Sequence, residues 1–233
     1  MNPARIVLID DPTPYKNRHN IRKDGGKTRF GTGVDHKYSL GTMTEQELID
    51  LGPRIQAICA PDAYVMPWVT KPNLPMGIRI LEARGLFYKT TLFEWEKLYP
   101  DASSFKGTGR YTFSNLEALL LGRYPGAKCW HPKTGYKPQM LQRTTHPRYL
   151  GLPHSRKPEV IQDEIEKWLG PYIGDYTLVE LFATRQRPGW TCLGYDVTGR
   201  DIRDDLDDLA FEMSLAEIWR RGKPKVDRHQ CVC

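Results

Sequence analysis

The sequence predicts an α/β fold with a mostly parallel sheet and covering helices. Strand-like and helix-like segments alternate along the chain, and 233 residues with 39% apolar content suffice for one substantial core. Near the start, a β-prone run ends abruptly after Ile9 in Asp10, Asp11 and Pro12. Carboxylates and prolines directly after a buried strand are typical of the carboxyl edge of such a sheet, where α/β proteins bind ligands.

Apolar periodicity places the individual elements in order along the chain. Strands are expected at residues 5–9, 63–68, 88–94, part of 111–121, 178–182 and 191–195. Helices are expected at residues 44–51, 74–84, 158–169 and 202–219. The third helix is the best defined, because Pro158 suits a first helical position and Gly170 follows the last apolar repeat. The fourth begins with a cluster of aspartates, whose negative charge favours the exposed amides of a helix start.

We expect one domain over residues 1–200, followed by a C-terminal helix and tail at 201–233. The net charge of +6 is concentrated in two segments of that domain. Residues 15–39 carry seven basic side chains against two acids, interleaved with glycines, and residues 122–157 carry eight basic side chains and no acid, among aromatics and prolines. Basic loops that carry aromatic residues suit a polyanion with stackable bases.

Several classes of protein are excluded by what the chain lacks. No stretch approaches the apolar length of a membrane span, and the first residues do not follow the pattern of a secretory signal. The five cysteines are odd in number and scattered, which favours a reduced compartment without disulfides. Cys129, His131, His146 and His154 lack the paired spacing of a zinc module, so we expect no metal site. The composition therefore favours a soluble, intracellular protein.

Short motifs are spread over most of the chain. They are Asp-Pro-Thr-Pro-Tyr at 11–15, Thr-Met-Thr-x-x-Glu-Leu at 42–48, Pro-Trp-Val-Thr at 67–70, Ala-Arg-Gly-Leu-Phe-Tyr-Lys-Thr at 83–90, His-Ser-Arg-Lys-Pro at 154–158, Glu-Leu-Phe-Ala at 180–183, Pro-Gly-Trp at 188–190 and Gly-Tyr-Asp at 194–196. In order and spacing, over residues 5–197, they resemble the MT-A70 family of adenine methyltransferases. In that family the first motif is Asp-Pro-Pro-Trp, and the fourth begins Ala-Trp-Gly.

The resemblance implies a Rossmann-like methyltransferase fold with permuted motif order, S-adenosylmethionine as the cofactor, and the N6 amine of adenine as the acceptor. It implies that the catalytic residues are Asp11, Pro12, Pro14 and Tyr15. It implies that the cofactor-binding residues are Asp10, Lys157, Phe182, Tyr195 and Asp196.

The resemblance also implies nucleic acid as the partner, with DNA favoured over RNA because the chain is similar to bacterial or phage members. We expect the protein to lie in the cytoplasm of a bacterial or phage-infected cell. The sequence leaves open whether it forms a homodimer or a heterodimer. The two basic segments supply the expected nucleic-acid contacts. These are Lys16, Arg18, Arg22, Lys23, Lys27, Arg29, Arg143, Arg148 and Arg156.

The chemistry explains why such residues are needed. An exocyclic adenine amine is a poor nucleophile because its lone pair is delocalised into the ring. Asp11 and the carbonyl of Pro12 could accept hydrogen bonds from the amine, orient its lone pair toward the methyl group and stabilise the developing positive charge. A base in a duplex must first leave the stack, and an aromatic side chain such as Tyr15 would then hold it.

The sequence departs from the family in the motif that matters most, since Thr13 and Pro14 stand where the family has Pro and Trp. One interpretation is an inserted threonine, with Tyr15 supplying the aromatic face. The other is a catalytically silent nucleic-acid-binding subunit, or a methyltransferase with an altered base or an RNA substrate. Tyr195 and Thr184 also replace the asparagine and arginine that are common in the family. An acid before a proline also commonly caps a turn, so Asp10 and Asp11 have a structural alternative as well.

Overall fold

A seven-stranded sheet forms the centre of the molecule, with strand order β5-β3-β4-β2-β1-β6-β7. The structure is a computed structural model that describes residues 1–13, 42–107, 111–127, 140–152, 156–173 and 177–221. The strands are β1 (Ala4–Ile9), β2 (Cys59–Thr70), β3 (Phe87–Leu98), β4 (Leu116–Arg123), β5 (Met140–Thr145), β6 (Thr177–Leu181) and β7 (Trp190–Leu193). This is the α/β, Rossmann-like fold that the sequence predicts.

The directions of the strands determine which strand ends lie at the same edge of the sheet. Strand β4 runs antiparallel to both of its neighbours, β2 and β3, whereas the other neighbouring pairs are parallel. The carboxyl ends of the six co-directional strands therefore lie along one edge of the sheet, together with the amino end of β4. We call this edge the carboxyl edge.

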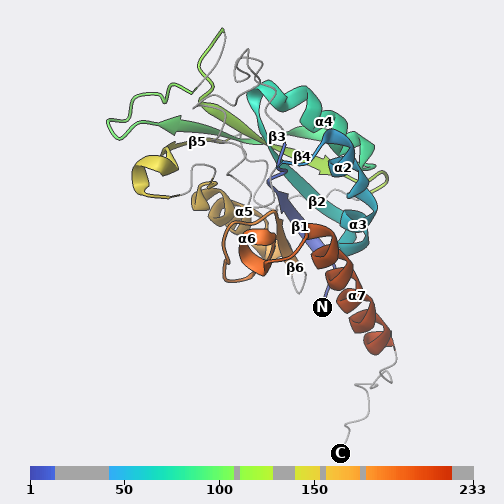
Figure 1. Cartoon of the computed structure of the whole chain (residues 1–233). Coiled ribbons are helices and arrows are strands. Elements are labelled where there is room, and N and C mark those ends of the chain that lie inside the picture. The colour runs from blue at the N-terminus through green and yellow to red at the C-terminus, as the bar shows by residue number, and fades with distance from the viewer. Residues whose placement is uncertain (14–41, 108–110, 128–139, 153–155, 174–176, 222–233) are drawn as a thin grey trace, which may run out of the picture.

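Helices cover both faces of the sheet (Figure 1). One face carries α2 (Glu45–Asp50), α3 (Gly52–Ile58), α4 (Leu74–Ala83) and α7 (Ile202–Arg221), whose buried residues share a core cluster with Val7 and Ile9 of β1. The other face carries α5 (Glu159–Ile173), whose Ile161 packs in a second cluster with Ile6 and Leu8. Successive residues of β1 thus point to opposite faces, as a pleated strand requires. The chain also has a short helix, α6 (Tyr195–Thr198), and the 3-10 helices η2 (Lys71–Asn73) and η3 (Pro147–Leu150).

Several predicted elements are found close to their expected positions, each with a local cause. Helix α2 begins with a capping box, in which Thr44 accepts from the backbone N–H of Glu47 and the Glu47 carboxylate accepts from the backbone N–H of Thr44. Helix α5 begins at Glu159, one residue after the predicted start, and continues through Gly170 to Ile173, beyond the predicted end. Helix α7 packs through Ile202 and Leu206 into the first core cluster, so the expected C-terminal helix is part of the core.

The sequence analysis missed α3 and β5. Helix α3 starts with Gly52 and Pro53, which normally signal a turn, but proline is tolerated in the first turn of a helix. Strand β5 lies at the edge of the sheet, and it falls inside the 122–157 segment that the sequence analysis treated as a basic loop. Its register with β3, which pairs Glu96 with Arg143, depends on a distant strand and not on an apolar pattern of its own.

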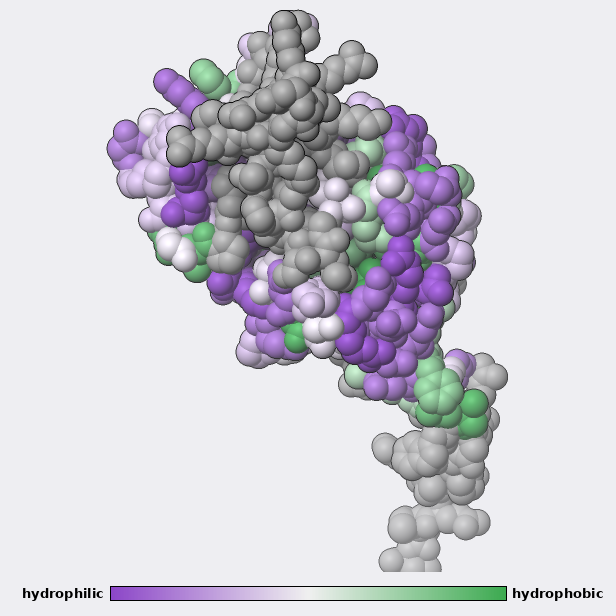
Figure 2. Space-filling model, viewed as in Figure 1, coloured by the Kyte–Doolittle hydropathy of each residue, from purple (hydrophilic) through white to green (hydrophobic). Residues whose placement is uncertain are grey.

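The C-terminal half of α7 extends beyond the body of the molecule (Figure 1). Figure 2 shows apolar surface there, to which Phe211, Leu215 and Ile218 contribute, with 63%, 49% and 66% of their surfaces exposed. Among the described residues, no helix combines the length and the apolar character that crossing a bilayer would need.

Gly77 allows α4 to lie close against β2, because a Cβ atom at this position would stand 2.3 Å from Cγ1 of Val69. We expect Gly77→Ala to destabilise the protein by about 1–3 kcal/mol through overpacking, measured by urea denaturation. Without the steric clash, alanine in a helix interior would instead stabilise by about 0.5–1 kcal/mol. A stabilised variant would therefore contradict the packing described.

Candidate active site

Two consecutive aspartates follow β1 at the carboxyl edge and point to opposite faces of the sheet. The alternation in β1 continues beyond Ile9, so Asp10 follows Ile6 and Leu8 toward α5, whereas Asp11 follows Val7 and Ile9 toward α4. The backbone N–H of Asp10 donates to the carbonyl of Leu181 in β6 at 3.3 Å, which holds the end of β1 against its neighbour. Both carboxyl groups are largely buried.

Asp10 lies in a cluster of alternating charges. The ammonium group of Lys157 is 2.9 Å from Oδ1 of Asp10 and 3.0 Å from Oε2 of Glu117, at the start of β4. Lys97, near the end of β3, pairs with the other carboxylate oxygen of Glu117. The cluster therefore joins the ends of three strands to the start of α5, and its two ammonium groups balance its two carboxylates.

Lys157 is held in its charged form by this arrangement. Burial lowers the pKa of Lys157, but the nearby charges of Asp10 and Glu117, together with their hydrogen bonds, outweigh burial and raise the pKa above its ordinary value. The ring of Trp68 lies beside the ammonium group, with its centroid 5.8 Å from Nζ. Lys157 is therefore a fixed cation at neutral pH and is suited to hold an anionic group, not to accept a proton.

Asp11 makes a separate, buried ion pair on the opposite face. The guanidinium group of Arg84, at the end of α4, binds both carboxylate oxygens of Asp11, at 2.8 and 3.0 Å. The side chains of Arg84 and Asp11 are 2% and 6% exposed. Nε of Arg84 also donates to the carbonyl of Leu48 in α2 at 2.9 Å. Asp11 therefore fastens α2 and α4 to the end of β1.

The corner after Asp11 is fixed by further hydrogen bonds. The carbonyl of Pro12 accepts from the backbone N–H of Met43 at 2.9 Å, and the backbone N–H of Thr13 donates to the carbonyl of Asp11 at 2.8 Å. The hydroxyl of Thr13 accepts from the side-chain amide of Asn73 at 3.3 Å. Pro14 and Tyr15, which the sequence analysis assigned to catalysis, lie outside the described residues.

The predicted cofactor residues of the last two strands lie at the same edge. Phe182 directly follows β6, is 8% exposed and has a left-handed backbone with φ of 58°. Tyr195 and Asp196 follow β7 in α6, and Tyr195 is exposed. Gly194 permits the close approach between the two strand ends, because a Cβ atom there would stand 2.8 Å from the backbone N and O of Ala183. Since Leu181 of β6 pairs with Ile9 of β1, Phe182 and Asp10 follow neighbouring strand ends, but Phe182 packs in the first core cluster, on the opposite face of the sheet.

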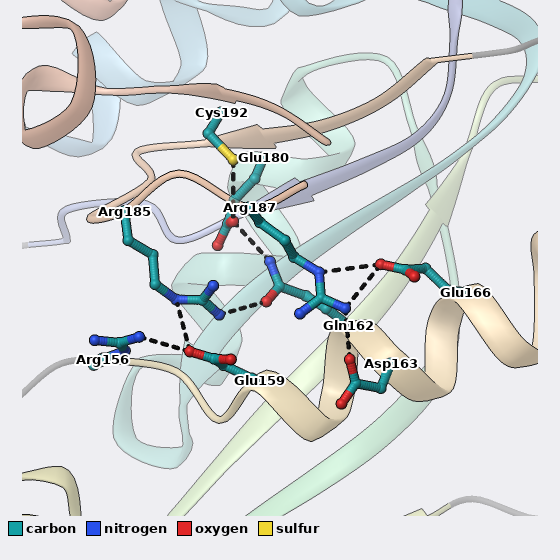
Figure 3. A network of polar contacts seen from close by, with 9 residues as sticks. All are labelled: Arg156, Glu159, Gln162, Asp163, Glu166, Glu180, Arg185, Arg187 and Cys192. Atoms are coloured by element: carbon teal, nitrogen blue, oxygen red, sulfur yellow. Dashed lines mark hydrogen bonds and ion pairs between the residues drawn. The ribbon is translucent and has the colours of Figure 1, made fainter. Parts of the chain in front are cut away.

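A polar network fixes the start of α5, and with it Lys157, against the loop between β6 and β7 (Figure 3). Arg185 contacts Gln162 at 2.7 Å and Glu159 at 3.4 Å, and Gln162 donates to the carboxylate of Glu180 at 2.7 Å. Arg187 extends the network to Asp163 and Glu166. Burial raises the pKa of Glu180. The network explains how Lys157, which lies just before a helix, keeps a defined position.

The predicted nucleic-acid residues fall into two groups. Arg143 of β5 pairs with Glu96 at 2.9 Å, Arg148 belongs to η3, and Arg156 pairs with Glu159 at 2.6 Å. All three belong to the segment that leads from β5 to the start of α5. The others lie outside the described residues; they are Lys16, Arg18, Arg22, Lys23, Lys27 and Arg29.

Two buried donors near the end of β2 have no hydrogen-bond partner in the described part of the chain. They are the indole N–H of Trp68 and the hydroxyl of Thr70, and Trp68 is 3% exposed. Buried polar groups are normally paired, so these two are available to a ligand. Together with the ammonium of Lys157, they can donate to the carboxylate and hydroxyl groups of S-adenosylmethionine. The donor set at the carboxyl edge therefore fits the cofactor that the sequence implies.

The sequence analysis missed Lys97 and Arg84 and left Glu117 without a role. Lys97 carries no local signal, because its importance comes only from the pairing of β3 with β4. Arg84 did carry one, since it stands where the family motif has tryptophan. That replacement marks the position as unusual but does not name its partner, which the structure identifies as Asp11.

Comparisons with known proteins agree with this geometry. The family model described as MT-A70 matches residues 5–196, which extend from β1 into α6. The chain is also 25% identical over 206 residues to the type II methyltransferase M.MunI of a Mycoplasma species, and the match covers 85% of this chain and 79% of that protein. Asp10, Glu117 and Lys157 all lie within the matched range.

The Asp11–Arg84 pair is expected to stabilise the fold strongly. Asp11→Asn leaves a buried guanidinium without its charge partner and should cost about 3 kcal/mol or more in urea denaturation. The matched control is Asp62→Asn, whose pair with Arg5 also joins β1 but is partly exposed, and which should cost about 1 kcal/mol or less. The double variant Asp11→Leu/Arg84→Met should recover much of the loss. An Asp11→Asn variant as stable as the control would contradict the structural role.

Proposed function

Since the chain belongs to the MT-A70 family, we propose that this methyltransferase uses S-adenosylmethionine to methylate the N6 amine of adenine in DNA. The observation that carries the proposal is the contact between Asp10 and Lys157 at 2.9 Å. It brings the acid-proline corner at one end of the chain together with the Lys-Pro motif near the other. Ligand binding at this edge is the general behaviour of open α/β sheets.

We assign the catalytic carboxylate to Asp10 and not to Asp11. With Asp10 as the acid, the segment Asp10-Asp11-Pro12-Thr13 aligns with Asp-Pro-Pro-Trp without an insertion; Asp11 stands in place of the first proline and Thr13 in place of the tryptophan. Arg84 stands in place of another family tryptophan, and it forms a buried ion pair with Asp11. The pair explains the second aspartate of the motif as a structural change that leaves Asp10 facing Lys157.

The proposed chemistry requires little more than orientation. S-adenosylmethionine supplies an electrophilic methyl group on a sulfonium, so no covalent enzyme intermediate is needed. Asp10 accepts a hydrogen bond from the adenine amine, which aligns the lone pair of the nitrogen and stabilises the positive charge that develops on it. Lys157 holds Asp10 in position and offers its charge to the carboxylate of the cofactor. Glu117 and Lys97 fix Lys157 in turn.

DNA is proposed as the substrate on two grounds. The relative described above is named as a type II methyltransferase. The segment from residue 122 to residue 157 carries no acid, and three of its described arginines, Arg143, Arg148 and Arg156, lie between the start of β5 and the start of α5. This distribution suits a phosphate backbone. We place the protein in the bacterial cytoplasm, where such a substrate is found.

The proposal is tested by titrating S-adenosylmethionine calorimetrically and measuring N6-methyladenine in DNA by nucleoside mass spectrometry. Asp10→Asn should lower the methylation rate by about 100-fold or more, because an oriented hydrogen bond in the transition state is lost. Lys157→Met should weaken cofactor binding about tenfold or more. The matched control is Lys167→Met, at an exposed lysine on α5, the helix that Lys157 precedes, and it should change neither.

Each outcome has a defined meaning. Absence of cofactor binding by the wild type would contradict the methyltransferase proposal and favour a silent nucleic-acid-binding subunit. Cofactor binding without N6-methyladenine in DNA would contradict the proposed substrate. Full activity in Asp10→Asn would contradict the assignment of the catalytic carboxylate, and urea denaturation of every variant separates these results from loss of the fold.

A further inference from the structure

Exposed aromatic side chains gather at the carboxyl edge, beside β3 and β5. Tyr111, Phe113 and Tyr149 have 90%, 61% and 42% of their surfaces exposed. They belong to segments that follow strand ends at this edge: residues 99–107 and 111–115 lie between β3 and β4, and residues 146–150 follow β5. Exposed aromatic rings beside the proposed active site offer flat faces on which bases can stack.

Residues 99–107 and residues 146–150 are held together by a cluster of rings. Ring centroids are 5.3 Å apart for Tyr99 and Phe105, 5.7 Å for Tyr99 and Tyr149, and 4.4 Å for Phe105 and His146. Backbone hydrogen bonds fasten both segments to β3, from Phe105 to the carbonyl of Lys97 and from His146 to the carbonyl of Leu98. The ring of Tyr149 therefore stands on a fixed support, and the backbone N–H of Ser114, next to Phe113, donates to the carbonyl of Gly107 at 3.4 Å.

Cationic groups accompany two of the exposed rings. Nζ of Lys106 is 5.7 Å from the centroid of Phe113, and the guanidinium carbon of Arg148 is 5.3 Å from the centroid of Tyr149. Of the acidic side chains in the same region, Glu96 is paired with Arg143 and also accepts from Ser104, whereas Asp101 accepts from Ser103 and keeps its charge. The surface thus presents rings and positive charge together, a combination that suits stacked bases and phosphates.

This surface is continuous with the charged cluster of the proposed active site. The backbone carbonyl of Lys97 accepts a hydrogen bond from the backbone N–H of Phe105, and the side chain of Lys97 forms an ion pair with Glu117. Glu117 in turn contacts Lys157 at 3.0 Å. A strand that presents its target base at Asp10 would therefore pass over the rings with its neighbouring nucleotides.

We propose that Lys106, Tyr111, Phe113, Arg148 and Tyr149 form an aromatic rim that binds the DNA strand flanking the target base. The inference rests on the proposed function and adds the surface that grips the substrate. The rings stack on bases next to the target, and Lys106 and Arg148 contact phosphates. A protein partner is disfavoured by the cations beside the rings, which a polyanion satisfies better than an apolar interface does.

The chain offers a matched control at the opposite edge of the sheet. Phe87, at the amino end of β3, is 54% exposed, and Nζ of Lys89 lies 5.1 Å from its ring centroid. This pair has the same chemistry as Phe113 with Lys106, but it lies at the far end of the same strand from the rim. Variants at the two places therefore differ in location and not in residue type.

The test measures binding of fluorescein-labelled single-stranded and duplex DNA by anisotropy, in the presence of S-adenosylhomocysteine. Tyr111→Ala/Phe113→Ala should weaken binding about tenfold or more, because base stacking is lost, and Phe87→Ala should leave it unchanged. Lys106→Ala should reduce the slope of log affinity against log salt by about one, and Lys89→Ala should not. Cofactor affinity and thermal unfolding should match the wild type in all four.

The failure of this inference differs from the failure of the proposed function. If the wild type binds and methylates DNA, and the rim variants do so equally well, the rim is not the binding surface. If the wild type binds no DNA, both proposals fail. RNA bound in place of DNA with the same dependence on Phe113 would overturn the choice of DNA, and equal losses in Phe87→Ala would show a general effect of removing exposed rings.

Discussion

The pleat at the end of β1 is the constraint from which the rest of the site follows. It sends two neighbouring carboxylates to opposite faces of the sheet, and each meets a buried cation there, Lys157 for Asp10 and Arg84 for Asp11. One pair gathers the ends of β1, β3 and β4 around the start of α5, and the other fastens α2 and α4 to the sheet. A shift of one residue in the register of β1 would exchange these roles, so the register determines which aspartate meets a ligand.

The division of work between the two aspartates accounts for a motif that departs from its family. In the alignment proposed above, Asp11 stands in place of a proline and Arg84 in place of a tryptophan, and a charge at either position alone would be buried without a partner. Together they form a bidentate pair with additional hydrogen bonding to Leu48, which is the geometry that makes a buried ion pair tolerable. Asp11 and Arg84 therefore pair with each other on the opposite face of the sheet from Asp10 and its charged cluster.

The sequence predicted the parts of the molecule that depend on local patterns. The α/β class, β1, α4 and α5 follow from apolar runs and prolines, and the placement of Asp10 and Lys157 in one site is what the family resemblance implies. Strand β5, Lys97 and the Asp11–Arg84 pair could not be predicted in the same way, because each depends on partners that are distant in the sequence. The sequence also could not show which of two adjacent acids faces α5, since that depends on where the last strand residue lies in the register.

The most direct test is a crystal structure of the protein with S-adenosylhomocysteine. The account predicts that the carboxylate of Asp10 and the ammonium of Lys157 face the bound product, while Asp11 keeps both of its contacts with Arg84. A complex in which Asp11 has left Arg84 and turned toward the sulfur, or in which the product binds away from Lys157, would contradict it.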